Sequence, residues 1–518
     1  VCDFASRHSG ARRIHLPPHG PAPEMRRTLP IALARRLRVA PVGWTNERLL
    51  LATPDPFNVP ALDLVRQTAG CELDVVTAPE REVLAALDRL ETAGPTLGES
   101  IERSVRDTTG QESPAVAETQ AVPVSQPDAP VIALVQQMLE RAVRCGASDL
   151  HLEPLENAVS LRLRRDGVLH PDVLIPKALQ PAVTSRLKLI GDLDVTETRR
   201  PQDGRATVVV DHRPVHLRLS SLPTRFGESV VVRLLDAGAE IRGLQDLGLP
   251  PGLEHRLRQL VETPHGVLLV TGPTGSGKTT TLYAILSELN EPGVGIFTLE
   301  DPIELTLPGI RQTQIQEEIG LTFGTALRSL LRQDPDILLV GETRDAETAG
   351  LMIRAALTGH LVFSTLHTND APGAIPRLLD LGVEPCLIPD SLVGAVAQRL
   401  VRRLCTACRH RVFHAESSSL PLEHPLPAGQ PMDSWEAVGC PECRGTGYRG
   451  RQGLFELMVP DGQFHDAVMR RAPHSEFDRL ARAAGMVPLA EDGWRLVHQG
   501  VTTVAEVLQA TRSAASRT

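Results

Sequence analysis

The chain has 518 residues, too many for one ordinary hydrophobic core, so two to four domains are expected. Its 42% hydrophobic and 23% charged content is typical of a soluble globular protein, and no run approaches the 18 apolar residues of a membrane span. The net charge of −9 and the 3% aromatic content disfavour a nucleic-acid-binding protein, which needs a basic surface and stacking side chains.

Lysine is rare in this chain. It occurs only at Lys177, Lys188 and Lys278, so arginine supplies nearly all of the positive charge. A coding bias explains this on the surface. A lysine kept inside a glycine-rich loop still calls for a chemical reason, because arginine and lysine are not interchangeable at phosphate sites.

The N-terminal quarter predicts one small domain between two segments without structure. Residues 1–24 lack the apolar run of a secretory signal, and we interpret them as disordered or as an incomplete start to the chain. Residues 25–92 predict a small α/β domain, and residues 93–130, rich in Pro, Ser, Thr, Gly and Glu, predict a linker. The elements expected in the small domain are helices at 30–37, 59–68 and 80–90 and strands at 48–52 and 73–77.

Residues 131–240 predict a second α/β domain that is dense in arginine. An amphipathic helix at 131–144 opens it and a second helix follows at 178–190. The expected strands are 159–164, 206–210, 216–220 and 229–234.

Residues 241–518 predict a third domain with a mostly parallel sheet. Short apolar runs alternate with helical stretches, as expected for strands buried on both faces. A cysteine-bearing insert occupies 405–443, and a helical part covers 461–511. The expected strands are 267–271, 295–299, 337–340 and 361–365.

A phosphate-binding loop follows the first of these strands. The run from Gly272 to Thr279 matches G-x-x-x-x-G-K-[ST] at every fixed position, between an apolar strand and a helical stretch. Backbone N–H groups of such a loop surround a phosphate, the lysine reaches the β- and γ-phosphates, and the Thr279 hydroxyl is a ligand for Mg²⁺. The residues predicted to bind ATP are Gly272, Pro273, Thr274, Gly275, Ser276, Gly277, Lys278, Thr279 and Thr280.

Acidic residues follow two other strands of the same sheet. Glu300 and Asp301 end the strand at 295–299, and Glu342 ends the strand at 337–340. Ligands of open α/β sheets bind at the carboxyl ends of the strands, so these carboxylates are expected near the phosphates. Gly341 stands where many P-loop proteins have the Mg²⁺-binding Asp. We therefore assign water activation to Glu342 and metal contact to Glu300 or Asp301, although each site could equally be a helix-capping carboxylate.

Two histidines flank the strand at 361–365. His360 precedes it and His367 follows it, which makes both candidates for sensing the γ-phosphate. A structural role for either histidine is the alternative.

Four cysteines form two C-x-x-C pairs in the insert. Cys405, Cys408, Cys440 and Cys443 supply the donor set of a closed, structural Zn²⁺ site. The 31 residues between the pairs turn polar and Pro-rich and suit a surface loop. Two redox-active pairs are the alternative, but the surroundings are not those of a thioredoxin.

Several further motifs resemble the secretion ATPases of the type II secretion and type IV pilus assembly superfamily. The runs that carry the resemblance are 300–304 (EDPIE), 331–336 (LRQDPD), 340–342 (VGE), 358–360 (TGH) and 364–370 (STLHTND). The resemblance extends from about residue 29 onward. It implies a RecA-like P-loop ATPase core, preceded by a PAS-like α/β domain and a small N-terminal α/β domain.

The arginine-rich domain resembles the same family. Its motifs are ASDLHLEP at 147–154, RRPQDGR at 199–205 and GESVVVR at 227–233. The resemblance implies that some of these arginines approach the phosphates when the two domains close, as arginine fingers do. Pairing with surface carboxylates is the alternative for each of them. The candidates are Arg205, Arg218, Arg225 and Arg233.

The resemblance also implies a biological role. It implies a cytoplasmic homohexamer, attached to the inner membrane through L-type and F-type platform proteins, that hydrolyses ATP to drive pseudopilus assembly and protein export. A type IV pilus assembly ATPase is the alternative. A pilus retraction ATPase is disfavoured, because these generally lack the cysteine insert. A nucleic-acid motor and an ATP-binding scaffold that does not hydrolyse ATP are alternatives from other classes.

Overall fold

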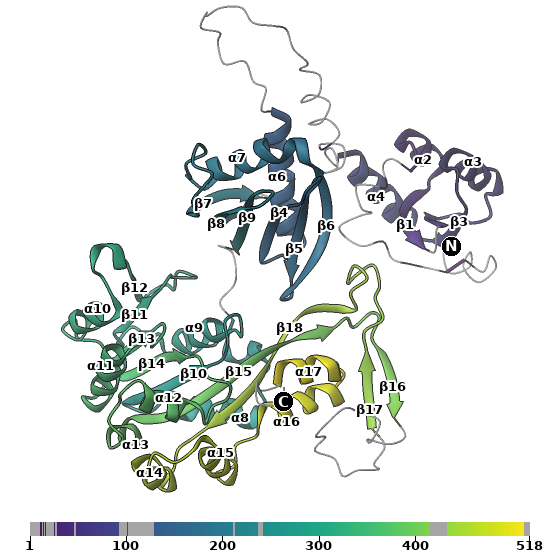
Figure 1. Cartoon of the computed structure of the whole chain (residues 1–518). Helices are drawn as coiled ribbons and strands as arrows, with labels where there is room; N and C mark the ends of the chain where they lie inside the picture. Colours follow the sequence, from purple (N-terminus) through teal and green to yellow (C-terminus); the bar gives the residue numbers. More distant parts are fainter. Residues whose placement is uncertain are drawn as a thin grey trace, which may run out of the picture. The chain divides into compact units, whose positions relative to one another are not determined.

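The computed structural model has a mixed α/β architecture, as predicted (Figure 1). The chain divides into two compact units, the larger built mainly from Leu234–Thr518. Nearly all of the predicted linker lies outside the described residues. The structure describes residues 11–12, 14, 16, 25, 28–45, 48–92, 101, 129–210, 213–236, 242–414 and 432–511.

The small N-terminal domain is a three-stranded sheet packed against helices. Its central strand pairs antiparallel with one neighbour and parallel with the other. The first strand was not predicted, because Pro41 and Gly43 interrupt its apolar pattern and the pairing register shifts between them. The elements are α2 (Ile31–Leu37), β1 (Ala40–Thr45), β2 (Arg48–Thr53), α3 (Val59–Ala69), β3 (Leu73–Thr77) and α4 (Glu80–Thr92).

Disorder was predicted for the N-terminal segment, but this does not hold at its described positions. The Ile14 N–H donates to the Thr77 carbonyl at 2.9 Å, and the Thr77 N–H donates to the Arg12 carbonyl at 2.9 Å. Ile14 and Leu16 pack against the hydrophobic core of the small domain. This stretch is therefore paired with strand β3, and the remaining N-terminal residues lie outside the described ranges.

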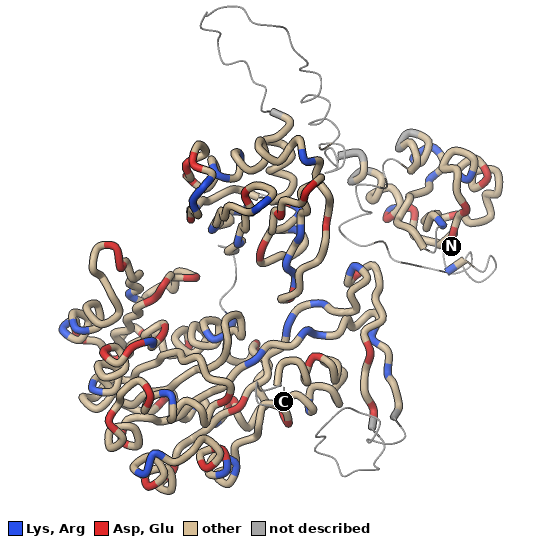
Figure 2. Tube along the Cα trace, viewed as in Figure 1, with Lys and Arg blue, Asp and Glu red and all other residues tan. Residues whose placement is uncertain are grey.

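The arginine-rich domain contains a six-stranded sheet in the order β6-β5-β4-β9-β8-β7. Val159, Leu161 and Leu163 of β5 are buried, whereas the residues between them point to the other face. Lys and Arg recur along several of these strands (Figure 2). Strands β4 and β6 were not predicted. The elements are α6 (Ala129–Arg144), β4 (Asp149–Pro154), β5 (Ala158–Arg165), β6 (Val168–Pro176), α7 (Gln180–Ile190), β7 (Gln202–Val210), β8 (Arg213–Thr224) and β9 (Gly227–Asp236).

A buried ion pair lies inside this domain. Lys188 is 1% exposed, and its ammonium donates to the Glu228 carboxylate at 2.8 Å and to the Glu197 carbonyl at 2.8 Å. The Ser221 hydroxyl also donates to Glu228 at 2.8 Å. The lysine thus joins helix α7, strand β9 and the loop before β7.

The third domain is built on a seven-stranded sheet in the order β12-β11-β13-β14-β10-β15-β18. All neighbouring strands are parallel except β15 and β18, which are antiparallel. All four strands predicted for this domain are present. The strands are β10 (Gly266–Thr271), β11 (Ile296–Glu300), β12 (Arg311–Gln314), β13 (Ile337–Val340), β14 (Leu361–Leu366), β15 (Leu392–Leu404) and β18 (Tyr448–Met458).

Hydrophobic layers cover both faces of this sheet. Leu268 and Val270 of β10 belong to one cluster, and Val267 and Leu269 belong to the other, so successive residues of the strand alternate between the two. The first layer includes helices α8 (Pro251–Val261) and α9 (Lys278–Leu289). The second includes α10 (Phe323–Leu330), α11 (Ala346–Leu357), α12 (Ala374–Asp380), α13 (Leu387–Ser391), α14 (Gly462–Met469), α15 (His474–Ala483) and α16 (Leu489–His498).

The cysteine insert contains a two-stranded antiparallel sheet that was not predicted. Strands β16 (His410–His414) and β17 (Met432–Glu436) pair across the segment that was expected to be a surface loop, and residues 415–431 between them lie outside the described ranges. The helical C-terminal part was predicted and ends with α17 (Val504–Thr511). Within the described ranges, every helix is too short or too polar to span a membrane.

Candidate functional site

The phosphate-binding loop joins the end of β10 to the start of α9. Gly272, Gly275 and Gly277 have φ values of 149°, 79° and 90°, which favour glycine. A Cβ on Gly272 would lie 2.6 Å from the Gln398 carbonyl oxygen, and a Cβ on Gly277 would lie 2.7 Å from the amide nitrogen of the Gln398 side chain. Glycine is therefore needed at position 272 because the backbone of strand β15 lies against it, and at position 277 because of its left-handed backbone conformation.

Lys278 is the first residue of α9. Its ammonium donates to the carbonyl oxygens of Gly272 and Pro273 at 2.7 Å and 3.1 Å. Burial lowers the pKa of Lys278, the Glu342 carboxylate opposes that shift, and the Arg399 guanidinium adds to it. Thr279 and Thr280 follow and are exposed. The lysine and the helix N-terminus thus place positive charge at the loop.

Glu342 follows strand β13 directly after Gly341. The side chain is 15% exposed, and it forms an ion pair with Arg344 at 2.6 Å. A Cβ on Gly341 would lie 2.9 Å from the Leu299 carbonyl oxygen. An aspartate therefore does not fit at position 341, and the first carboxylate available after β13 is Glu342.

Glu300 is the last residue of strand β11, and Asp301 follows it. In the sheet, β11 is separated from β14 by strand β13. Glu300 is 4% exposed, and its carboxylate accepts hydrogen bonds from Tyr283, from Thr298 at 2.5 Å and from Gln312 at 3.1 Å. Burial and the Glu300 charge raise the pKa of Tyr283. Asp301 is exposed. Glu300 is thus tied to helix α9 through Tyr283, and the metal contact assigned to this pair stays a prediction.

The two predicted histidines lie at opposite ends of β14. His367 follows the strand at its carboxyl end, where burial and the charge of Lys278 lower its pKa and Glu342 opposes the shift. His360 precedes the strand, next to Gly266 at the start of β10.

The γ-phosphate sensor predicted at His360 does not agree with this geometry. Parallel strands present their amino ends at one edge of the sheet, and the phosphate loop lies at the other edge. The His360 Nδ1–H instead donates to the Ala355 carbonyl at 2.8 Å, near the end of α11. His360 therefore has a helix-capping role.

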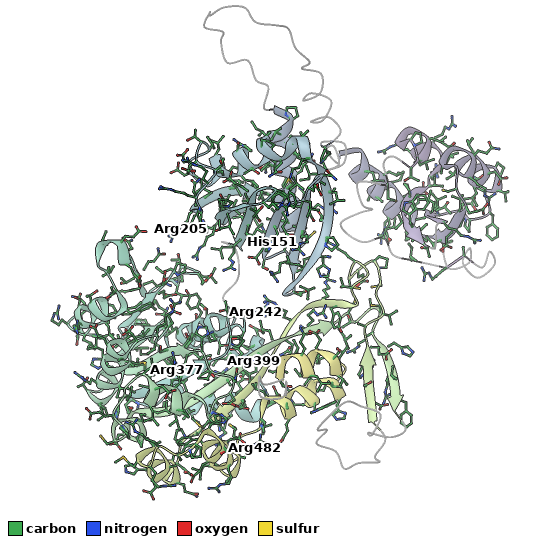
Figure 3. All side chains as sticks on the ribbon, in the orientation of Figure 1. His151, Arg205, Arg242, Arg377, Arg399 and Arg482 are labelled. Carbon is green, nitrogen blue, oxygen red and sulfur yellow. The ribbon has the colours of Figure 1, made fainter. Side chains whose placement is uncertain are left out.

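The four candidate arginines lie on strands β7 to β9 of the arginine-rich sheet. Arg205 is exposed on β7 (labelled in Figure 3), and Arg218 is half-buried on β8. Arg225 lies over the Phe226 ring, 5.4 Å from its centroid, in the turn between β8 and β9. Arg233 pairs with the Asp149 carboxylate at 3.0 Å.

The four cysteines of the insert come together in one cluster. Their sulfur atoms all lie within 4.8 Å of one another, with Cys405–Cys440 at 3.7 Å and Cys408–Cys443 at 3.8 Å. Four thiolates around Zn²⁺ at about 2.3 Å are about 3.8 Å apart in a tetrahedron, so the residues fit this metal. Burial opposes ionisation of Cys443, but N–H groups of Cys440 and Gly447 at 3.1 Å from its sulfur favour the thiolate, and its pKa falls to about 7.

Sequence reasoning missed the contribution of strand β15 to this site. Gln398 and Arg399 lie beside the phosphate loop, and the Gln398 side chain accepts a hydrogen bond from Thr281 of α9 at 2.7 Å. No strand or helix was predicted for the segment 391–401 that carries them. Its apolar and basic residues resemble those of a helix, so the sequence pattern did not indicate a strand next to β10.

The parallel sheet, the glycine loop ahead of α9 and the charged residues gathered there are the arrangement expected of an ATPase. Residues 124–509 match the family described as type II/IV secretion system protein, and residues 9–97 match the MshEN domain. The chain belongs to the type II/IV secretion system protein family.

Curated relatives include proteins of both branches of this family. The type II secretion system protein HxcR of Pseudomonas aeruginosa is 48% identical over 75% of this chain and 79% of its own length. The type II secretion system ATPase E of Vibrio cholerae is 45% identical over 75% of this chain and 76% of its own length. The type IV pilus assembly ATPase PilB of Myxococcus xanthus is 40% identical over 98% of this chain and 90% of its own length.

A solved structure has the same fold over most of the chain. The ATPase DotB of Yersinia pseudotuberculosis superposes with a TM-score of 0.54 over 76% of this chain and 96% of that chain, at 20% identity. At this identity the likeness shows the fold alone.

Proposed function

We propose that this chain is the ATPase of a type II secretion system, which hydrolyses ATP to drive pseudopilus assembly and protein export. The observation that carries the proposal is the meeting of Lys278, Glu342 and His367 at the carboxyl ends of β10, β13 and β14, where the Glu342 charge acts on the ionisation of both Lys278 and His367. Relatives named as type II secretion system proteins, one of them as an ATPase, support the biological assignment.

Each of these side chains has a separate task in hydrolysis. Backbone N–H groups of the loop hold the β- and γ-phosphates, and Lys278 moves from the loop carbonyls to the phosphate oxygens. Glu342 orients the attacking water and accepts its proton. His367 lies where it can sense the γ-phosphate as a neutral ring. Mg²⁺, held by the Thr279 hydroxyl and through water by Glu300 or Asp301, would neutralise phosphate charge.

The cysteine cluster holds a structural Zn²⁺ in this proposal. All four positions of a tetrahedral site are filled by cysteine, so the metal has no open coordination position and takes no part in hydrolysis. Its role is to fix the insert between β15 and β18.

The working assembly in this proposal is a homohexamer at the cytoplasmic face of the inner membrane. Inner-membrane platform proteins of the L and F types hold it there, the L-type protein through the small N-terminal domain. Arginines of the sheet β7–β9 supply charge to the transition state when the domains close. Arg205 is the strongest candidate because it is exposed, whereas Arg218 is half-buried, Arg225 lies over the Phe226 ring and Arg233 pairs with Asp149. Nucleic acid is not among the expected partners.

A type IV pilus assembly ATPase is the second candidate function. The pilus relative from Myxococcus xanthus, which is 40% identical over 98% of this chain, supports it. The type II secretion system protein E of Xanthomonas campestris is also 40% identical, over 97% of this chain, so coverage alone does not separate the two functions. The two functions share the hydrolytic site and differ in the platform protein. Stimulation of ATPase activity by the cytoplasmic domain of the secretion L-type protein, and not by a pilus platform protein, is the expected result.

The substitution Glu342→Gln tests the hydrolytic assignment. We expect kcat to fall at least about 100-fold while ATP binding is retained, because an amide cannot accept the proton of water. Turnover measured with purified protein, together with binding of a fluorescent ATP analogue, gives both quantities. Glu347→Gln is the matched control, since Glu347 is exposed and pairs with Arg328. Unchanged turnover in Glu342→Gln would remove Glu342 from the mechanism.

A further inference from the structure

Strand β15 contacts both ends of the phosphate-binding loop through two consecutive residues. Gln398 is 3% exposed and lies against Gly277, on the face of the sheet that holds α9. A Cβ on Gly272 would lie 3.1 Å from the Nη1 atom of Arg399, so the guanidinium lies against the first residue of the loop. Consecutive residues of a strand point to opposite faces, so Arg399 lies on the other face of the sheet.

The Arg399 side chain donates hydrogen bonds to two backbone carbonyl groups. Its Nη1 donates to the Gln398 carbonyl at 3.0 Å, and its Nη2 donates to the Asn369 carbonyl at 2.5 Å (Arg399 is labelled in Figure 3). Burial lowers the pKa of Arg399, and the nearby Glu456 and Asp370 carboxylates oppose that shift. A half-buried cation is thus used to hold main chain in place.

The main chain that Arg399 holds is the segment that carries His367. This segment follows β14 and crosses the start of the loop, since the Gly272 N–H donates to the Leu366 carbonyl at 3.3 Å and the Thr271 hydroxyl donates to the Asp370 carbonyl at 3.5 Å. These two contacts are long. The bond from the Arg399 guanidinium to the Asn369 carbonyl ties strand β15 to the same segment, and because it is charge-assisted it is stronger than these two neutral contacts.

The same segment is anchored to the C-terminal helices. The Asp370 carboxylate accepts from the His474 ring of α15 at 2.8 Å, and the buried Glu456 carboxylate accepts from the Ala371 N–H at 2.8 Å and the Leu489 N–H at 3.0 Å. Arg399 holds the end of the segment that lies against the phosphate-binding loop, and these carboxylates hold the end that faces α15 and α16.

We propose that Arg399 is a positioning residue for ATP hydrolysis, which sets the distance between the phosphate-binding loop and the segment bearing His367. The inference rests on the proposed function. It assigns to Arg399 an effect on turnover rather than on ATP binding, because the phosphates are held by Lys278 and the loop amides whether or not the segment is in place.

The test compares Arg399→Gln and Arg399→Lys with Arg403→Gln. Arg403 lies on the same strand and is exposed, so it is the matched control. We expect kcat of Arg399→Gln to fall at least about tenfold with ATP affinity changed less than about threefold. Arg399→Lys should recover part of the loss, because it keeps the charge and the hydrogen-bond donors but lacks the two separate nitrogen atoms with which Arg399 contacts the Gln398 and Asn369 carbonyl groups. Arg403→Gln should resemble the unsubstituted chain.

Amide hydrogen exchange separates this proposal from failure of the proposed function. In Arg399→Gln, with or without ATP, peptides covering Gly272–Gly277 and Asn369–Gly373 should exchange faster, while a peptide from β18 should not. If the chain shows no ATPase activity, the proposed function fails and this measurement still tests the contact. Unchanged exchange in both peptides, or equal losses of kcat and of ATP affinity, would overturn the positioning role.

Discussion

At the scale of single residues, the three lysines share one structural use. Each ammonium donates to backbone carbonyl groups: Lys177 to Leu155 and Phe226, Lys188 to Glu197, and Lys278 to Gly272 and Pro273. Three donors on one compact atom can reach acceptors from different segments, which a flat guanidinium does less readily. The two lysines outside the phosphate loop therefore also have a structural role, as donors to backbone carbonyl groups.

The buried pair of Lys188 and Glu228 predicts a large effect on stability. Lys188→Ala leaves an uncompensated carboxylate in the core and should lower the free energy of unfolding by roughly 3–5 kcal/mol. The thermal unfolding temperature of the full chain is the measurement. In the double variant Lys188→Met, Glu228→Leu both charges are gone, so most of the loss should be recovered. A double variant as unstable as Lys188→Ala would contradict this account.

The lowered pKa of His367 predicts a pH dependence of turnover. Because the pKa in the folded chain lies below 6.5, the imidazole is neutral at neutral pH and gains a proton only as the pH falls below that value. A charged ring beside Lys278 is unfavourable, so kcat should be constant above about pH 6.5 and decrease below it. His367→Gln should lack this decrease. Superimposable pH profiles of the two proteins would show that another group titrates.

At the scale of elements, the sequence predicted strands well where apolar runs were short and bounded by turns. Strands β10, β11, β13 and β14 fit that description, and all four were found. Strand β15 was missed because pairing with β10 and β18 overrides the helical character of its residues, and β16 and β17 because they flank a polar segment. The strands that were missed are those whose own residues do not show a strand pattern and which form only because they pair with a neighbouring strand.

The candidate site was predictable to the extent that it follows strand ends. The loop after β10, the carboxylate after β13 and His367 after β14 were expected at the carboxyl edge of the sheet and lie there. His360 was also proposed as a γ-phosphate sensor, but a residue that precedes a parallel strand lies at the amino edge of the sheet, away from the phosphate loop. Arg399 belongs to an unpredicted strand, so no sequence pattern placed it at the loop.

The cysteine insert predicts a metal-dependent element. Four thiols within 4.8 Å of one another should bind about one equivalent of Zn²⁺ per chain, and removal of the metal should destabilise the insert that connects β15 and β18. Elemental analysis and thermal unfolding with and without a chelator measure both effects. Cys443→Ser should lose the metal, whereas Cys386→Ser, at an exposed position, should retain it. Full stability after metal removal would contradict a structural role.

At the scale of the whole molecule, the proposed hexamer predicts that activity depends on concentration. If arginines complete a site only in the assembled ring, specific ATPase activity should rise with protein concentration and then level off. Light scattering should give a mass six times that of the 56.1-kDa chain where the activity is constant. Arg205→Gln should lower the plateau activity without changing the mass. Full activity at concentrations where only monomers exist would remove the need for a ring.

The contacts of the three lysines also bear on how the chain can be labelled. Reagents directed at side-chain amines have three targets in 518 residues: one inside a domain core, one held between two backbone carbonyl groups, and one in the phosphate loop with a lowered pKa. Lys278 lies in the loop that is proposed to hold the phosphates, so bound nucleotide would shield its amine from such reagents. Acylation chemistry, which scatters over the surface of most proteins, therefore becomes a selective reporter of nucleotide occupancy in this one.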